Sequence, residues 1–323
     1  MRRFLARRLA HGAAVVFIAA SLSFLLVHLA PGDPFSSALD SASVSPSTKA
    51  QLRAAYGLDG SLADQYVRFL GQLVRGNLGP SLAFGRPAAD VLRDALPHTL
   101  LLMGAALVLS FAFGVALGAW QAARAGTRTD RLVGTASSIV AALPEFWLGV
   151  VLLLLLAVRY RVFPSGGVTD LVMHDSMSPL GQLIDRARHL ALPALTLTLL
   201  GVASISRYQR AALLEVMPKD FVRTARAKGV AERTIVWRHA LRNALVPTLV
   251  LAGLSLPALL GGAVFVEYVF SWPGLGKVAT QAFGARDHQL VVGATIMGAV
   301  LVVVGGILTD LCHAAADPRV RPR

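Results

Sequence analysis

Six runs of apolar residues, each long enough to cross a lipid bilayer, constrain the fold of this chain more than any other feature. They cover roughly residues 9–30, 100–120, 132–158, 190–206, 244–266 and 290–311. A hydrocarbon core of about 30 Å needs about 20 apolar residues in a helix. Only 15% of the 323 residues are charged, against about 25% in soluble domains. The runs therefore predict an all-α, polytopic membrane protein with six transmembrane helices.

The first apolar run could be mistaken for a secretory signal peptide. Four arginines precede it, and the small residues near Ala30 could pass for a cleavage site. However, the apolar stretch is longer than the roughly 7–15 residues of a signal peptide, and further runs follow it. We therefore expect residues 1–30 to form an uncleaved N-terminal transmembrane helix.

The basic residues are distributed unevenly between the apolar runs. The net charge of +13 could suggest nucleic-acid binding, but that function needs a basic patch on a folded face. Here the excess lies before the first run, at 121–131, at 207–243 and at the end of the chain. With six spans, these four segments fall on one side of the membrane. The positive-inside rule then predicts that both termini are cytoplasmic.

The remaining segments complete the expected organisation. Residues 31–97 are expected outside the cytoplasm, with two short amphipathic helices, one around Leu52 and Tyr56 and one around Phe69 and Leu73. Residues 98–311 form a five-helix core, and residues 312–323 form a cytoplasmic tail. The single cysteine, Cys312, excludes a disulfide within the chain and a cysteine metal site.

The long inner loop, 207–243, has a helical pattern with a break. Gly229 follows a helix-compatible run from Val222 to Lys228, where a C-terminal glycine would stop a helix. We expect a short helix, a break at Gly229 and a second helix that leads into the fifth span. Such a knob suits docking into the groove of a partner. Contact of its basic residues with lipid headgroups is the alternative, and both interpretations stay open on physical grounds.

The same loop resembles the coupling loop of ABC importer permeases, and more narrowly that of the dipeptide/oligopeptide/nickel permease family. The general signature is Glu-Ala-Ala, three residues, Gly, and this chain matches it at Ala225 and Gly229 only. This departure is typical of the peptide branch, and it places Arg223 at the position of the general family's Glu. The expected ATPase-coupling residues are Arg223, Thr224, Ala225, Arg226, Ala227, Lys228 and Gly229.

Further motifs extend the resemblance over nearly the whole chain. They occur in the order expected for this branch, and several spaced motifs together are far more specific than any one alone. They are the segments 29–34 (LAPGDP), 76–81 (GNLGPS), 144–149 (PEFWLG), 163–167 (FPSGG), 239–247 (HALRNALVP), 270–276 (FSWPGLG) and 317–321 (DPRVR).

The resemblance implies the helical bundle of a type I ABC importer permease in a bacterial inner membrane. It implies a second homologous permease subunit, two cytoplasmic ATPase subunits that dock on the coupling loop, and an extracytoplasmic solute-binding protein. ATP and Mg would bind to the ATPases, so we expect no cofactor, metal or catalytic residue in this chain. The nearest approach to a P-loop, Gly274 to Val278, lacks the Ser or Thr and the first glycine spacing.

The solute stays open among dipeptides, oligopeptides, glutathione-like compounds and nickel. Nickel prefers imidazole and thiolate ligands, and the chain has no cluster of His and Cys, which favours peptides. The alternative to an ABC importer permease, from a different functional class, is an ion channel or an ion-coupled secondary carrier. Such proteins usually need several intramembrane charged groups or internal repeats, which the chain does not display.

Two further sites are predicted near the translocation path. Glu145 is the one acidic residue well inside a predicted span, where a charge is costly and usually functional. It is expected to line the path and contact a peptide amine or a cation; the alternative is a carboxylate that is hydrogen-bonded to a neighbouring helix or held protonated. Trp272, Pro273 and Gly274 are predicted as an outer gate or a contact for the binding protein, since proline and glycine favour turns. Trp272 could equally be an interfacial anchor.

Overall fold

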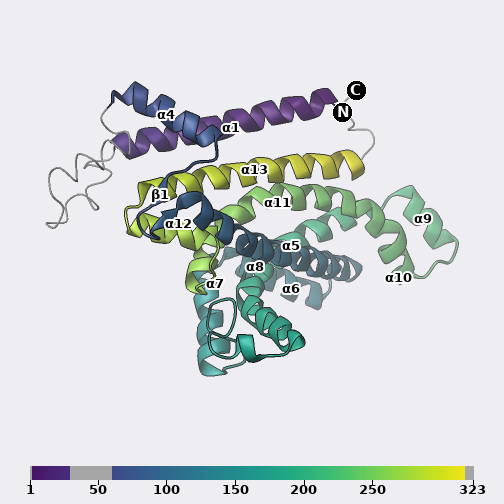
Figure 1. Ribbon diagram of the computed structural model, residues 1–323. Coiled ribbons are helices and arrows are strands. Elements are labelled where there is room, and N and C mark those ends of the chain that lie inside the picture. Colours follow the sequence, from purple (N-terminus) through teal and green to yellow (C-terminus); the bar gives the residue numbers. More distant parts are fainter. Residues whose placement is uncertain (1, 30–59, 317–323) are drawn as a thin grey trace.

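The computed structural model describes residues 2–29 and 60–316, apart from the side chains of residues 2, 3, 5, 250–263 and 311–316. The described chain is almost entirely helical (Figure 1). The long helices are α1 (Arg2–Leu29), α5 (Ala88–Ala123), α8 (Pro179–Val216), α11 (Leu241–Val269) and α13 (His288–Ala316). The shorter helices are α4 (Leu62–Val74), α6 (Arg128–Ala142), α7 (Glu145–Leu152), α9 (Asp220–Ala227), α10 (Glu232–Thr234) and α12 (Leu275–Gly284).

Three irregular helical pieces and one small hairpin complete the fold. A π-helical segment, Leu153–Arg159, continues α7, and a second, Ile235–Ala240, joins α10 to α11. A 3-10 turn covers His174–Ser176. Strands β1 (Pro80–Ser81) and β2 (Arg86–Pro87) pair antiparallel, with Ser81 opposite Arg86.

Four of the described helices are long and apolar enough to cross a membrane. They are 6–29 of α1, α5, α8 and 288–310 of α13. Helix α11 has 29 residues and coincides with the fifth apolar run, but the side chains of its middle part lie outside the described residues. The lengths and compositions of these helices therefore support a chain that crosses the membrane several times. The total of six spans stays a prediction.

The third apolar run is not one straight span. Helix α6 and the segment Glu145–Arg159 meet at an angle of 104°, so the predicted span over 132–158 is divided into two helical halves at Pro144. Proline disfavours the helical conformation in the residue before it. Leu143, which precedes Pro144, accordingly has an extended backbone with φ −74° and ψ 137°.

The centre of the bundle is the close contact between α5 and α8, the most extensive helix pair among the described residues. Glycine permits this approach. A Cβ atom at Gly118 would lie 2.5 Å from the backbone oxygen of Ser206, and one at Gly114 would lie 2.7 Å from Cβ of Ile205. Small residues are the usual means by which membrane helices approach closely.

Helix α4 lies in the range where the second amphipathic helix is predicted, and it packs on α1 and α13. The Tyr66 hydroxyl lies 2.7 Å from the Ser21 hydroxyl, and Gln65 Oε1 lies 3.0 Å from Nε2 of His28. The rings of Phe24 and Phe69 lie 5.4 Å apart. The first amphipathic helix, predicted around residues 52–56, falls outside the described residues.

The start of α1, the end of α13 and helix α9 lie toward the same side of the molecule (Figure 1). We call this side the elbow end and the opposite side the far end. Arg8 of α1 pairs with Asp310 of α13 near the elbow end, with 2.8 Å between Nε and Oδ2. Helix α13 continues to Ala316, five residues beyond the predicted end of the sixth span at residue 311.

Candidate functional site

The segment 219–240, called the elbow from here on, contains α9, the turn at Gly229, α10 and the second π-helical segment. Gly229 has a φ of +75°, a conformation that glycine adopts readily. Its N–H donates to the Arg226 carbonyl at 3.0 Å, and the Val230 N–H donates to the Ala225 carbonyl at 3.3 Å. These two bonds form a Schellman motif, which satisfies the last carbonyls of a helix. The predicted stop at Gly229 is therefore present.

Gly229 is required for its backbone conformation and not for space. A Cβ atom built there would meet no atom within 4 Å. Ala225, the second residue that matches the signature, is required for space. It is 9% exposed and packs with Val222, which is fully buried, against Leu213 of α8 and Ile235. A small side chain at this position lets α9 lie close to the bundle.

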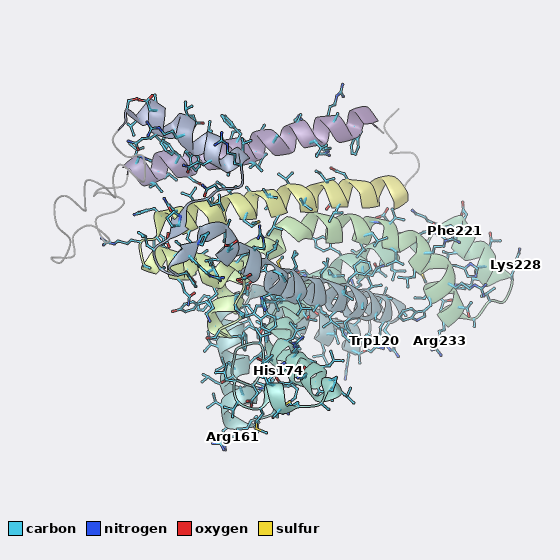
Figure 2. The ribbon with its side chains drawn as sticks, in the orientation of Figure 1. Trp120, Arg161, His174, Phe221, Lys228 and Arg233 are labelled. Carbon is cyan, nitrogen blue, oxygen red and sulfur yellow. The ribbon has the colours of Figure 1, made fainter. Side chains whose placement is uncertain are left out.

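The opposite face of the elbow is exposed. Phe221 and Lys228 lie at its tip, away from the bundle, and Arg233 lies on the α10 side (Figure 2). The exposed side chains of the predicted coupling residues are those of Arg223, Thr224, Arg226, Ala227 and Lys228. The elbow therefore presents one face of a short helix on a rigid, packed base.

One ion pair bridges the turn at Gly229. Arg226 donates from Nη2 to Oε1 of Glu232 at 2.7 Å and from Nε to Oε2 at 3.2 Å. These hydrogen bonds hold the pKa of Glu232 below its usual value and raise the pKa of Arg226. Since both side chains are about half exposed, the pair contributes little to overall stability. It fixes the orientation of α10 relative to α9.

Glu145 begins α7, directly after the bend at Pro144. Its Oε1 atom is shielded from solvent and has no hydrogen-bond partner among the described residues. One turn further, Gly149 packs against Thr196 of α8 and Phe270. The carboxylate therefore sits beside a helix break, near α8 and α11, with one acceptor unused.

A fully buried glutamate, Glu267 near the end of α11, was not singled out from the sequence. It accepts a hydrogen bond from the Thr99 hydroxyl at 2.6 Å on Oε1. Its Oε2 accepts from the backbone N–H groups of Gly276 at 2.7 Å and Lys277 at 3.2 Å. This carboxylate therefore joins the end of α11, the start of α12 and α5. The available signal was an acidic residue at the edge of an apolar run, followed by Gly274 and Gly276.

The predicted outer segment, Trp272 to Gly274, lies at the far end and is buried. Trp272 is 1% exposed, and its Nε1 donates to the backbone oxygen of His98 at 2.9 Å. A Cβ atom at Gly274 would lie 2.2 Å from Oε1 of Glu267. The alternative expectation that Trp272 anchors the chain at the lipid surface is wrong, because its indole packs inside the protein. Its role as an outer gate stays a prediction.

Other motifs meet at the far end. The Gly167 N–H donates to the Phe270 carbonyl at 3.0 Å, so the segment 163–167 packs on the segment 270–276. The segment 76–81 meets the start of α13, where the Ser81 hydroxyl donates to Asp287 at 2.5 Å. Asp287 also accepts from the Leu290 N–H at 3.1 Å. The motifs 76–81, 163–167 and 270–276 therefore make contacts between segments that lie far apart in the sequence.

Comparison with known proteins decides the family. Residues 114–322 match the family described as binding-protein-dependent transport system inner membrane component, and residues 1–103 match its N-terminal counterpart. The chain belongs to this permease family. The permease is 37% identical to the oligopeptide transport system permease protein AppB of Bacillus subtilis over 300 residues, which cover 93% of each chain.

Two further relatives match the permease over almost its whole length. It is 37% identical to the di/tripeptide transport system permease protein DppB of Pseudomonas aeruginosa, with 99% of each chain covered. It is 33% identical to the dipeptide transport system permease protein DppB of Escherichia coli, again with 99% of each chain covered. The resemblance found in the motifs is thus confirmed.

The predicted site residues of the permease form separate groups. The coupling residues lie together in the elbow, whereas Trp272 to Gly274 lie at the far end. Glu145 lies apart from both groups, at the bend between α6 and α7. Within residues 2–29 and 60–316, no three His, Cys, Asp or Glu side chains are grouped so that they could hold a metal ion.

Proposed function

We propose that the permease imports peptides as one transmembrane subunit of an ATP-driven ABC importer and forms half of its translocation path. The observation that carries this proposal is the full-length match to permeases named for oligopeptides, di/tripeptides and dipeptides. These names favour peptides over nickel or a glutathione-like solute. The chain itself is a path and a docking partner, and it does not hydrolyse ATP.

The proposed complex contains a second permease subunit, two cytoplasmic ATPase subunits that bind ATP and Mg, and an extracytoplasmic binding protein. It lies in the bacterial inner membrane with both termini and the elbow in the cytoplasm. The positive-inside rule supports this orientation, since seven basic and only two acidic residues fall within 219–243. The far end, with α4 and α12, then faces the binding protein.

The elbow is the proposed ATPase-docking element. Its buried base, Val222 and Ala225, fixes α9 to the bundle, and its exposed face carries Arg223 and Lys228. An amphipathic helix that places exposed side chains in a groove is a common recognition mode. Its rigid attachment means that a movement imposed on α9 also moves the helices beneath it.

Reversing two elbow charges tests this docking. Arg223→Glu combined with Lys228→Glu is expected to lower the amount of ATPase that co-purifies with the permease by about tenfold or more, since like charges placed across an interface cost several kcal/mol. Uptake of a labelled dipeptide into proteoliposomes is expected to fall in parallel. The matched control is Arg86→Glu with Arg93→Glu, two exposed arginines remote from the elbow in the sequence. Full ATPase binding by the elbow variant would exclude docking at these residues and favour contact with lipid headgroups.

Glu145 is proposed to line the path and to contact the amine of a peptide or another cation. The unused, shielded Oε1 atom supports this role, because a buried acceptor without a partner is costly. The bend at Pro144 supports it as well, because non-helical backbone within a membrane occurs where it is buried in protein or lines a cavity.

Glu145→Gln removes the charge and retains the shape of the side chain. Uptake of a dipeptide with a free amine is expected to fall about tenfold, because a hydrogen bond to a charged group contributes about 1.5–3 kcal/mol. Uptake of the N-acetylated dipeptide is expected to change much less. The exposed Glu215→Gln serves as the control. If the two substrates respond equally to Glu145→Gln, the carboxylate does not recognise the amine.

A further inference from the structure

A partly buried ion pair links α6 to α8 near the elbow end. Arg210 of α8 donates from Nε to Oδ1 of Asp130 at 2.8 Å and from Nη2 to Oδ2 at 2.7 Å. Asp130 is 3% exposed, and its Oδ2 also accepts from the Gly126 N–H at 3.0 Å. Two parallel bonds between a guanidinium and a carboxylate fix relative orientation as well as distance. The pair therefore defines how the start of α6 sits on α8.

The same level of α8 also contacts α5 and α11. Gln209, the neighbour of Arg210, donates from Nε2 to the Ala244 carbonyl of α11 at 3.4 Å. A Cβ atom at Gly118 of α5 would lie 3.0 Å from the backbone nitrogen of Arg210, which places the two helices in direct contact. We call these contacts of residues 209 and 210 with α5, α6 and α11 the junction. Four helices therefore meet there.

The junction lies next to the base of the elbow. One turn beyond Arg210, Leu213 of α8 enters the apolar cluster that buries Val222 and Ala225. Ala119 of α5 belongs to the same cluster, and the adjoining Trp120 lies toward the elbow in Figure 2. A displacement of α9 is therefore passed directly to the part of α8 that carries Arg210.

Helix α6 buries few of its own side chains, and the carboxylate of the ion pair is one of them. Of its fifteen residues, the buried ones are Asp130 and Ser137, whereas Leu132 and Ile139 are 70% and 59% exposed. Helix α6 leads directly to the bend before Glu145. Packing along their lengths also holds α6 on α8, and the ion pair adds a polar contact of defined geometry at the start of α6.

We propose that the Asp130–Arg210 ion pair is a positioning link that makes α6, and with it the bend at Pro144, move together with α8 when the elbow moves. This inference rests on the proposed docking of an ATPase at the elbow. It concerns the transmission of the movement and not the docking itself. Because the Asp130 carboxylate is taken out of water, the pair is expected to add little net stability over apolar packing, which agrees with a role in orientation.

Asp130→Asn in the complete complex tests the link. The asparagine retains the shape of the side chain and removes the charge that holds Arg210. In proteoliposomes with the binding protein, the variant complex is expected to assemble and to hydrolyse ATP. The number of dipeptides imported per ATP hydrolysed is expected to fall about tenfold. Arg210→Lys, which keeps the positive charge, is expected to retain at least half of the wild-type ratio.

Two controls separate this link from other failures. Asp94→Asn breaks an exposed ion pair with Arg86 and is expected to leave the transport ratio unchanged. An unchanged ratio in Asp130→Asn would overturn the link, and so would a parallel loss of uptake and hydrolysis that matches a loss of folded complex. If Asp130→Asn does not assemble, Arg210→Gln is judged by the same criteria. Absence of a bound ATPase from the wild-type complex would instead refute the proposed function.

Discussion

Replacing Gly118 with valine is expected to leave little folded permease, because the side chain has no space between α5 and α8. Its Cβ atom alone would lie 2.5 Å from the Ser206 carbonyl oxygen and 2.8 Å from Cβ of Gln209. Two of the three nearest atoms belong to the backbone of α8, so no change of rotamer can relieve the contact. The free energy of unfolding is expected to fall by about 3 kcal/mol or more. Thermal unfolding of the subunit in detergent and its yield after size-exclusion chromatography measure the effect.

Gly104→Val provides the matched control in the same helix. A Cβ atom at Gly104 meets no atom within 4 Å, so the subunit is expected to unfold within about 0.5 kcal/mol of the wild type, as for most surface substitutions. If both variants lose stability equally, valine itself disturbs α5. The close approach of α5 to α8 would then not be the cause.

Local signals in the sequence were sufficient for the elbow. A glycine after an amphipathic run stops a helix without help from distant residues, and the structure places this stop at Gly229 with the two hydrogen bonds of a Schellman motif. Long apolar runs likewise predict helices directly. The last run was expected over 290–311 and lies within α13, His288–Ala316.

The bend in the third run required tertiary information. A proline such as Pro144 disfavours the helical conformation in the residue before it, but it sets no angle by itself. The 104° between the two halves goes with the packing of α7 on both α8 and α11. Composition cannot reveal such packing, because an apolar run indicates which residues form a membrane helix but not which neighbouring helices they contact.

Pairings between charged or polar residues that lie far apart in the chain could not be predicted from the sequence either. Asp130 and Arg210 are 80 residues apart, and Thr99 and Glu267 are 168 residues apart. Each residue lies close to the end of an apolar run, where charged and polar side chains are ordinary loop residues. Their burial follows from where α5, α6, α8 and α11 meet, which one sequence does not specify.

Replacing Glu267 with leucine is expected to lower the free energy of unfolding strongly, through the loss of contacts at the far end of the permease. Leucine would leave the Thr99 hydroxyl and the N–H groups of Gly276 and Lys277 without their acceptor in a fully buried site. Each unsatisfied buried donor costs about 1–3 kcal/mol, so a loss of about 4 kcal/mol is expected. Glu267→Gln keeps an acceptor but places an NH₂ group near these donors, and a loss of about 2 kcal/mol is expected.

Hydrogen exchange can locate this loss. The amides of Gly276 and Lys277 are expected to lose protection in Glu267→Leu, whereas the Gly229 amide, bonded to the Arg226 carbonyl within the elbow, should keep its wild-type exchange rate. Glu215→Leu, at an exposed position of α8, should leave thermal unfolding unchanged and serves as the control. Unaltered protection at Gly276 and Lys277 would mean that α12 is held without the carboxylate. In that case the contacts of buried Trp272 and Phe270, and not Glu267, fix the far end of the permease.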